Sequence, residues 1–398
     1  MGDLSEIVRG ASPRPIQDKK WFDSNSNVGW LRISDVTEQN GRITYLEQKI
    51  SKAGQEKTRV LFEPHLLLSI AATVGKPVVN YVNTGVHDGF LIFLNPIFDR
   101  EFMFQWLEMF RLKWHKYGQP GSQVNLNSEL VRNQEIMIPP IKEQVMIGGF
   151  FKQLDETITL HQDAIQHQQG LKNAMLQKLF PVNGARIPTV RFATFKEEWE
   201  QRKLSKVFNI LDGDRGKNYP GEKDFLEKGN TLFLDTGNVK KNGFEFKTTK
   251  YISKEKDDSL RSGKLELYDF VLTSRGTLGN VAYYNESVHN KYSSIRINSA
   301  MLILRPLKRN EVSDSYMEAV LRGNILDMFM KKNHVGSAQP HITKRDFSSL
   351  KVNIPNTFEE QQKIGAFFQS LDDTIALHQQ ALDTLKLLKK SLLQKMFV

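Results

Sequence analysis

The sequence has 398 residues, with 55 lysines and arginines, 45 aspartates and glutamates, and no cysteine. This length leaves room for two or three domains, and the lack of cysteine excludes a disulfide framework and a zinc ribbon. The formal charge of +10 favours a polyanionic partner such as nucleic acid. The first residues, MGDLSEIVRG, are charged where a signal peptide needs an apolar run, and no apolar stretch is long enough for a membrane span. We therefore expect a soluble, cytoplasmic protein.

Residues 1–138 are interpreted as a first block that mixes strands and helices. Short apolar alternations between turn residues predict strands at 28–36, 65–75 and 77–82. A helix with an aromatic face is predicted at 102–115. A Gly- and Gln-rich loop follows, then a short helix that begins at Asn127 or Ser128 and a strand that ends at Pro139.

The stretch from Glu143 to Phe180 recurs 217 residues later as Glu360 to Phe397, with 20 of 38 aligned positions identical. In both copies the apolar residues step alternately by four and three, which is typical of a heptad seam and predicts one long helix per copy. The seam residues that we expect to contact a partner are Phe151, Leu154, Ile158 and His161 in the first copy, and Phe368, Leu371, Ile375 and His378 in the second.

A helix of 38 residues is roughly 57 Å long, and a narrow apolar seam of that length needs a partner. The other copy is the simplest one, so we expect an antiparallel coiled coil with an approximate two-fold axis between the halves. His161 and His378 are interpreted as polar interruptions that fix the register. A metal site is not favoured, because no Cys or His lies at ligand spacing from them.

The second block, residues 182–354, repeats the order of the first. LSKVFNILDG (204–213) matches MGDLSEIVRG, FVLTSRGTLGN (270–280) matches the stretch that begins at Leu66, and GSAQPHITKRDFSSLKVNIP (336–355) matches 121–139. The second half differs in having a lead-in, Arg191 to Lys203, whereas the first half starts at Met1, already within the equivalent strand. Either the N-terminus is trimmed or the first half does not need a lead-in.

Polar and basic residues recur in the turns at matching places of both blocks. Arginine and lysine bind phosphate or guanine, and asparagine and glutamine can bind adenine. The predicted DNA contacts of the first block are Arg14, Lys19, Lys20, Thr73, Lys76, Gln123, Asn125 and Asn127. Those of the second block are Arg215, Lys217, Asn218, Ser274, Arg275, Thr277, Asn280, Gln339 and His341.

Catalytic motifs are weak by comparison. Asn95-Pro96-Ile97-Phe98 lacks the second proline of a methyltransferase motif, and no Gly-rich cofactor loop precedes it. Asp235, Glu245 and Lys247 have the spacing of a Mg-dependent nuclease site, but the first block has no equivalent. A phosphate loop, a Ser-His-Asp order and a His-Glu-x-x-His motif are all absent from the sequence.

The doubled pattern resembles the DNA-specificity subunits of type I restriction-modification systems. Glu-Gln-x-x-Ile-Gly-x-Phe-Phe-x-x-Leu-Asp-x-Thr-Ile opens each long helix and Leu-Gln-Lys-x-Phe closes it, and a Gly-Ser stretch leads to Ile-Pro before each. The resemblance implies an α+β fold, with two α/β target-recognition domains separated by an antiparallel pair of long helices. It also implies a non-catalytic subunit in which each domain reads half of a bipartite site in double-stranded DNA.

The family implies partners that carry the chemistry. These are two methyltransferase subunits, which bind S-adenosylmethionine, and two ATP-driven restriction subunits, so that S-adenosylmethionine, ATP and Mg are expected on the partners and no cofactor or metal on this chain. The expected boundaries are 1–138 and 182–354 for the recognition domains, and 139–181 and 355–398 for the spacer helices. A protein-bridging coiled-coil adaptor and a standalone DNA methyltransferase or nuclease are the alternatives.

Overall fold

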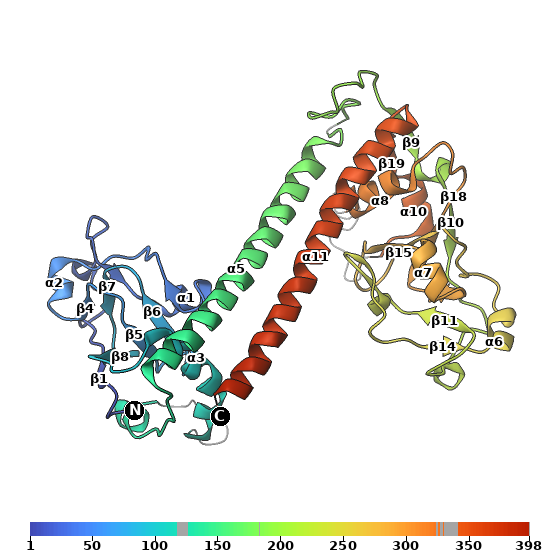
Figure 1. Cartoon of the computed structure of the whole chain (residues 1–398). Helices are drawn as coiled ribbons and strands as arrows, with labels where there is room; N and C mark the ends of the chain where they lie inside the picture. Colours follow the sequence, from blue (N-terminus) through green and yellow to red (C-terminus); the bar gives the residue numbers. More distant parts are fainter. Residues whose placement is uncertain (118–125, 183, 324, 327–328, 330–340, 398) are drawn as a thin grey trace. The chain divides into compact units, whose positions relative to one another are not determined.

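The structure is a computed structural model that describes residues 1–117, 126–182, 184–323, 325–326, 329 and 341–397. It divides into two compact units, which we describe separately. Unit 1 comprises Met1–Asp163 with Gln379–Val398, and unit 2 comprises Ala164–His378. The two predicted long helices are confirmed as α5 (Ile141–Lys178) and α11 (Phe358–Met396) (Figure 1). Each of these helices has one part in unit 1 and the other part in unit 2.

Unit 1 is built on a five-stranded sheet with the order β1-β8-β5-β6-β3. Its strands are β1 (Glu6–Arg9), β3 (Arg42–Ile43), β5 (Leu66–Ser69), β6 (Pro77–Asn80) and β8 (Phe90–Leu94). Neighbours are antiparallel except β3 and β6. A smaller sheet has the order β2-β7-β4, from β2 (Gly29–Trp30), β4 (Arg59–Leu61) and β7 (Thr84–Val86). The helical segments are η1 (Lys19–Trp21), α1 (Ile33–Glu38), α2 (Lys52–Gln55), α3 (Arg100–Phe110), η2 (Arg111–Tyr117) and α4 (Ser128–Arg132).

Both faces of the larger sheet of unit 1 are buried. Alternate residues of one strand belong to different cores, since side chains along a strand point to opposite faces. Leu66 and Leu68 of β5 pack in the cluster that includes α3, whereas Leu67 packs in the cluster on the other face. This explains why the strand has a continuous apolar run instead of an apolar and polar alternation.

The strand predicted at residues 28–36 is wrong over most of its length. Only β2 is extended, and α1 begins three residues later. The Asp35 carboxylate accepts a hydrogen bond from the backbone N–H of Arg32 (2.8 Å) and pairs with the Arg32 guanidinium (2.8 Å). These bonds satisfy donors at the start of the helix, and local hydrogen bonding of this kind outweighs the apolar alternation.

Unit 2 has a four-stranded sheet with the order β10-β18-β15-β16. Its strands are β10 (Phe208–Asp212), β15 (Phe270–Thr273), β16 (Val281–Tyr283) and β18 (Met301–Pro306). A second sheet has the order β14-β11-β17, from β11 (Thr231–Leu234), β14 (Tyr251–Ile252) and β17 (Ile295–Ile297). Two strand pairs complete it, β12 (Val239–Lys240) with β13 (Gly243–Phe244) and β9 (Glu200–Lys203) with β19 (Lys351–Ile354).

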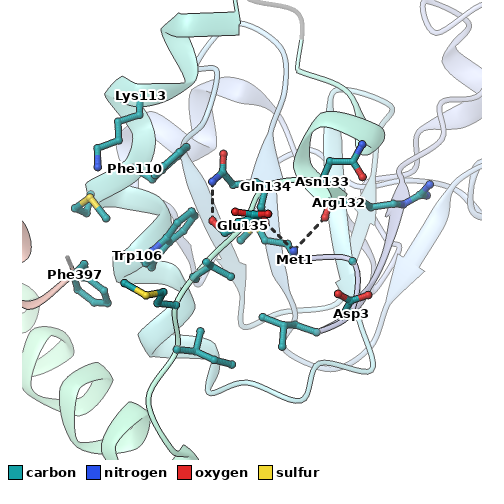
Figure 2. Close-up of a pocket in the computed structure, with 16 residues that line it drawn as sticks. Met1, Asp3, Trp106, Phe110, Lys113, Arg132, Asn133, Gln134, Glu135 and Phe397 are labelled. Atoms are coloured by element: carbon teal, nitrogen blue, oxygen red, sulfur yellow. Dashed lines mark hydrogen bonds between the residues drawn. The ribbon is translucent and has the colours of Figure 1, made fainter.

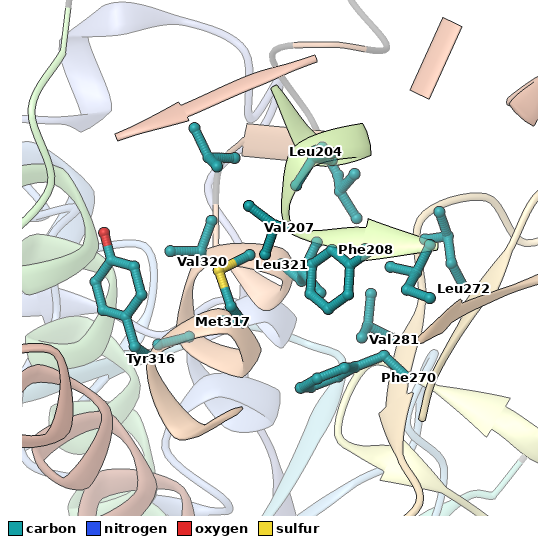
Figure 3. Close-up of a cluster of buried hydrophobic side chains, with 14 of the residues drawn as sticks. Leu204, Val207, Phe208, Phe270, Leu272, Val281, Tyr316, Met317, Val320 and Leu321 are labelled. Atoms are coloured by element: carbon teal, nitrogen blue, oxygen red, sulfur yellow. The ribbon is translucent and has the colours of Figure 1, made fainter. Parts of the chain in front are cut away.

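Helices cover one face of the four-stranded sheet of unit 2. Figure 3 shows Phe208, Phe270 and Leu272 of the sheet next to Met317 and Leu321 of α8. The described helical segments of this unit's block are η3 (Leu204–Lys206), η4 (Glu222–Asp224), η5 (Thr236–Asn238), α6 (Lys254–Ser259), α7 (Glu286–Lys291), α8 (Asp314–Arg322) and α10 (Lys344–Ser349). Both units therefore combine helices and sheets, as predicted.

In each unit a buried glutamine at an equivalent position joins the block to a long helix. In unit 1 the Gln144 side chain accepts from the N–H of Asp99 (2.9 Å), at the start of α3, and donates to the carbonyl of Pro139 (2.7 Å). In unit 2 the equivalent Gln361 accepts from the N–H of Ser313 (2.8 Å), at the start of α8, and donates to the proline carbonyl before α11 (3.0 Å). Both glutamines are 2% exposed.

The two long helices contact each other within each unit. Lys389 of α11 pairs with Asp155 of α5 in unit 1, and Lys172 of α5 pairs with Asp372 of α11 in unit 2. The second pair repeats the first with the helices exchanged, because Asp155 is equivalent to Asp372 and Lys172 to Lys389. Along α5 the residue numbers rise while those of the contacting residues of α11 fall, from Phe151–Phe397 to Asp155–Lys389 in unit 1 and from Lys172–Asp372 to Phe180–Phe368 in unit 2. Within each unit the two helices therefore run in opposite directions.

The predicted seam residues lie on the inward side of both helices. Phe151, Ile158, Phe368 and Leu371 are buried, and the other four of the predicted set, including both histidines, are half-buried. The rings of Phe151 and Phe397 lie 5.8 Å apart in unit 1, and those of the equivalent Phe368 and Phe180 lie 5.7 Å apart in unit 2.

Candidate nucleic-acid interface

In unit 1 the first basic turn follows β1 and leads into η1. The Arg14 side chain is 82% exposed and its guanidinium lies 3.2 Å from the Asp88 carboxylate. The Lys20 ammonium lies 4.4 Å from the ring centre of Trp21, and the indole N–H donates to the carbonyl of Pro15 (2.9 Å). The buried Trp21 thus holds the turn, while the side chains of Arg14, Lys20 and the neighbouring Lys19 remain exposed.

The equivalent turn of unit 2 follows β10. The Arg215 guanidinium donates to the carbonyl of Ser299 (3.2 Å), and the Asn218 amide donates to the carbonyl of Ser259 (3.1 Å). Lys217 between them is exposed. Asn218 therefore ties the turn to α6, and Arg215 and Lys217 carry its accessible charge.

The tight turn that follows β5 in unit 1 and β15 in unit 2 has similar backbone geometry in both units. Gly75 and Gly279 have φ values of +77° and +80°, and their N–H groups close the turn on the carbonyls of Ser69 (2.8 Å) and Thr273 (3.0 Å). A second left-handed position is occupied by Ala72 in unit 1 and by Gly276 in unit 2, at φ +56° and +73°. The correspondence predicted between residues 66–76 and 270–280 is therefore confirmed.

In unit 2 the side chains of this turn divide into accessible and internal groups. Arg275 and Thr277 are exposed, and within the described residues the Arg275 guanidinium has no hydrogen-bond or ion-pair partner. Ser274 is buried, and its N–H donates to the carbonyl of Ala300 (2.8 Å). The Asn280 amide donates to the carbonyl of Val239 (3.0 Å), so Arg275 and Thr277 are the groups that reach solvent.

In unit 1 the same turn presents little charge. The Lys76 ammonium pairs with Glu108 of α3 and donates to the amide oxygen of Asn40 (2.8 Å), and its side chain is 11% exposed. The half-buried Thr73 hydroxyl donates to that of Ser69 (3.3 Å). Lys76 would have to leave its ion pair to contact DNA, so its predicted contact carries an additional cost.

The third predicted cluster is described only in part, since Gln123, Asn125 and Gln339 lie outside the described residues. Asn127 is exposed and caps α4 by accepting from the N–H of Leu130 (2.9 Å). The equivalent residue in unit 2 is the cap of α10, and His341 is exposed two positions before it.

Two of the unit 2 clusters meet at the turn formed by residues 298–300. Arg215 contacts Ser299, and the backbone N–H of Arg275 donates to Ala300 (3.2 Å). In unit 1 the equivalent turn is 87–89, where Arg14 contacts Asp88 and the N–H of Ile70 donates to Gly89 (2.9 Å). Each unit therefore gathers its basic loops at one end of its main sheet.

The structure adds three arginines at the same places. Arg9 donates to the carbonyl of Asp88 (2.6 Å), and Arg59 donates to the carbonyl of Arg9 (2.9 Å). In unit 2 the Arg261 side chain is 79% exposed beside Asp214, in the first basic turn. These side chains come from strand ends and from a loop distant in sequence, and only their exposed positive charge could have indicated them.

Backbone and side-chain donors keep the carboxylates beside these arginines ionised. Burial opposes ionisation of Asp214, but hydrogen bonds from the N–H groups of Gly216, Arg261 and Ser262 outweigh it and lower the pKa of the carboxyl. A hydrogen bond from Ser12 lowers the pKa of Asp88.

The imidazole beside Asp88 remains neutral. Burial lowers the pKa of His87, whose Nδ1 accepts from the N–H of Gly89 (2.9 Å). The turn at 87–89 thus combines an anionic carboxylate with a neutral imidazole, and the described cations that contact Asp88 are Arg9 and Arg14.

The residues considered for catalysis have structural contacts. Asp235 caps η5 by accepting from the N–H of Gly237 (2.7 Å), and Glu245 pairs with Lys247 (3.0 Å). Across the residues that the structure describes, no group of three or more His, Cys, Asp or Glu side chains is arranged to hold a metal ion. No helix in the described part of the chain combines the length and apolar character needed to cross a membrane.

The family model described as type I restriction modification DNA specificity domain matches residues 1–168 and 196–387. The chain belongs to this family. The match includes every predicted DNA contact and most of each long helix, so the family predicted from the sequence is confirmed.

Two curated relatives of this family are similar over parts of their length. The specificity subunit of the type I restriction enzyme HindI from Haemophilus influenzae is 28% identical over 192 residues, which is 47% of this chain and 39% of that protein. A Mycoplasma genitalium protein named as a type I specificity subunit is 21% identical over 64% of this chain and 59% of its own length. The matched regions thus span less than two thirds of these relatives.

Solved structures share the fold. The S subunit of a type I restriction-modification system from M. genitalium has a TM-score of 0.65 at 15% identity, with 100% of this chain and 94% of that chain covered. A chain from a structure on complex assembly and conformational transition of a type I R-M system has a TM-score of 0.51 at 17% identity, with coverage of 99% and 97%.

Proposed function

We propose that this chain is the DNA-binding specificity subunit of a type I restriction-modification complex and has no catalytic activity of its own. Each block acts as a target-recognition domain that reads one half of a bipartite site in double-stranded DNA. One observation carries the proposal. The chain belongs to the DNA-specificity family, and each of its two units places basic loops at one end of its main sheet.

The loops at these sheet ends have the chemistry that DNA readout requires. Arginine and lysine neutralise phosphate, and arginine also binds guanine with two hydrogen bonds. Exposed cations such as Arg14, Lys19, Arg215, Lys217 and Arg275 are available for both roles. The side chains at equivalent positions differ between the units, so two different half-sites are expected.

The long helices act as an antiparallel coiled coil that sets the spacing between the half-sites. The exchanged ion pairs Asp155–Lys389 and Lys172–Asp372 support this pairing. A helix of 38 residues is roughly 57 Å long. This exceeds one turn of duplex, roughly 34 Å, and leaves helix surface for the docking of partner subunits.

The chemistry is assigned to those partners. Two methyltransferase subunits would bind S-adenosylmethionine and methylate adenine, and two restriction subunits would use ATP and Mg. The specificity chain works in the cytoplasm, where the DNA and these partners are present.

Genome-wide mapping of methylated adenine in the host strain, with and without this chain, tests the proposal. A bipartite methylated sequence should disappear when the chain is deleted and return with a plasmid copy. Replacement of the first block by that of another family member should change one half-site and leave the other. A methylation pattern that is indifferent to the deletion would contradict the proposal.

A further inference from the structure

A hairpin of unit 2, residues 239–244, presents two lysines that the candidate interface does not include. Strands β12 and β13 pair Lys240 with Gly243, so Lys241 and Asn242 form the tip of this lysine hairpin. Lys240, Lys241 and Asn242 are exposed, and within the described residues neither ammonium group has a hydrogen-bond or ion-pair partner. The hairpin therefore carries two accessible positive charges.

The lysine hairpin lies against the tight turn that carries Arg275. The Asn280 amide, at the end of this turn, donates to the carbonyl of Val239 in the hairpin (3.0 Å). A Cβ at Gly276 would lie 3.9 Å from the hydroxyl oxygen of Thr236, which belongs to η5, the short helix that leads into the hairpin. The hairpin and the Arg275 turn therefore lie at the same end of the four-stranded sheet.

Unit 1 has an equivalent turn, residues 36–41. In both units a polar side chain holds the start of the preceding helical segment, because the Asp35 carboxylate and the Asn238 amide oxygen each accept from a backbone N–H three residues earlier (2.8 and 3.1 Å). A glycine with positive φ ends each turn, Gly41 at +79° and Gly243 at +113°. The two turns therefore occupy the same place in their units.

The charges of these two turns differ. Val36 is followed by Thr-Glu-Gln-Asn in unit 1, whereas Val239 is followed by Lys-Lys-Asn in unit 2. Glu38, like the two lysines, is exposed. A phosphate group would be repelled by the turn of unit 1 and attracted by that of unit 2.

Charged side chains next to the turns are neutralised in both units. In unit 1 the Lys76 ammonium pairs with Glu108 of α3. The equivalent of Glu108, nine residues after the helix cap, is Arg322 of α8. Its guanidinium would lie 2.9 Å from a Cβ at Gly243, and it pairs with Glu318 (2.8 Å). The difference in charge between the two places therefore comes from the turns themselves.

The acidic residues on either side of the lysine hairpin already have partners. Glu245, which follows the hairpin, pairs with Lys247 (3.0 Å), and the Asp235 carboxylate accepts from the N–H of Gly237 (2.7 Å) at the start of η5. The two lysines are thus available to a polyanion, and each ammonium group that neutralises a phosphate releases a counterion from DNA.

We propose that the lysine hairpin is a further DNA-binding element of unit 2, in which Lys240 and Lys241 contact backbone phosphates beside the half-site that the Arg275 turn reads. It contributes affinity and position but no sequence preference, since phosphate is the same at every base pair. The equivalent turn of unit 1 lacks this contact, so the two domains hold their half-sites with unequal strength. The inference rests on the proposed function.

Fluorescence anisotropy of the full chain, with the duplex mapped by adenine methylation and with a duplex of altered half-sites, tests the proposal at several salt concentrations. Lys240→Ala/Lys241→Ala should weaken binding by about tenfold to a hundredfold at about 0.1 M salt, and should lower the steepness of log affinity against log salt by about two. Both duplexes should lose affinity by the same factor, because a phosphate contact does not distinguish sequences.

A matched control removes two lysines at the other end of the same unit. Lys203 and Lys351 are exposed and lie opposite each other in β9 and β19. Strand β9 precedes β10, whereas the first basic turn follows β10. Lys203→Ala/Lys351→Ala removes the same charge as the hairpin variant, but it should leave the salt dependence unchanged. Circular dichroism checks that both variants fold.

The reverse change tests the equivalent turn of unit 1. Glu38→Lys places a lysine where unit 2 has Lys241, and it should raise the affinity by about tenfold at about 0.1 M salt. Glu135→Lys makes the same change in charge at the position equivalent to Lys351. Glu135 lies beside Met1, at the other end of β1 from the basic turn (Figure 2), so its variant should not raise the affinity.

The possible failures are distinguishable. If the unmodified chain binds the mapped duplex and Lys240→Ala/Lys241→Ala binds it equally well, this inference is wrong and the proposed function stands. A changed preference between the two duplexes would overturn the assignment to phosphate, and equal gains from Glu38→Lys and Glu135→Lys would overturn the placement of the turn beside DNA. No binding of DNA by the unmodified chain would overturn the proposed function, and this inference with it.

Discussion

Arg275 is an exposed cation in the tight turn of unit 2, and its guanidinium has no partner among the described residues. We expect Arg275→Ala to weaken binding to the mapped DNA site by about tenfold to a hundredfold, the cost of one lost base or phosphate contact. The melting temperature of the Arg275→Ala protein should equal that of the unmodified protein. Fluorescence anisotropy against salt measures the affinity.

Arg186→Ala is the matched control, since Arg186 is also exposed and its 3.8 Å ion pair with Glu198 lies in the lead-in. It should leave DNA affinity unchanged. Equal losses for the two variants would indicate a general effect of charge and would contradict a specific role for Arg275.

His87 should make the folding stability of unit 1 depend on pH. Burial lowers the pKa of this imidazole below its usual 6.5, although Asp88 acts in the opposite direction. The unfolded chain therefore binds a proton more readily than the folded one, and stability should fall as the pH decreases below about 6.5. We predict that thermal melts from pH 7.5 to 5 show this loss and that His87→Asn, whose side-chain oxygen can still accept from Gly89, reduces the slope. An unchanged slope would refute the assignment.

At the level of the helices, replacing either of two adjacent glycines of α5 by alanine should have opposite effects on stability. A Cβ at Gly148 would lie 2.6 Å from the backbone nitrogen of Phe102, whereas one at Gly149 would have no atom within 4 Å. Gly148→Ala should destabilise unit 1 by about 1–3 kcal/mol, because α3 must move. Gly149→Ala should stabilise it by up to about 1 kcal/mol, because alanine favours the helix. Urea unfolding of both variants provides the test, and a stabilising Gly148→Ala would show that the helices are not packed this closely.

The elements that the sequence predicted correctly are those with a strong local or repeated signal. The long helices follow from a heptad step and an internal repeat, and the tight turn at 69–76 follows from its match to 273–280. The strand at 28–36 failed because the hydrogen bonds between Asp35 and Arg32 start a helix there.

The sequence indicated which residue types occur in the candidate site but not how their side chains are arranged in space. The contact of Arg215 with the turn at 298–300, the proximity of Arg9 to Arg59, and the ion pair that holds Lys76 all depend on long-range packing. No local pattern in the sequence reports such contacts.

In the molecule as a whole, the contacts that involve the long helices are more alike between the two halves than the exposed loops are. The buried glutamine and the lysine–aspartate pair occur in both units with equivalent residues. So does the close glycine of the long helix, because a Cβ at Gly365 would lie 2.6 Å from the backbone nitrogen of Tyr316, as one at Gly148 would from that of Phe102. The exposed loops differ, with Ala71 and Ala72 in one unit where the other has Arg275 and Gly276. A constant support with two different surfaces is what the reading of two unlike half-sites requires.

The most direct test of the account is to insert one heptad into both long helices and to map the methylated adenines. Seven residues add roughly 10 Å of helix, or about three base pairs at 3.4 Å each. Both half-sites should keep their sequence while the unread gap between them becomes longer. A methylated site with the original gap would contradict the claim that the paired helices set the spacing.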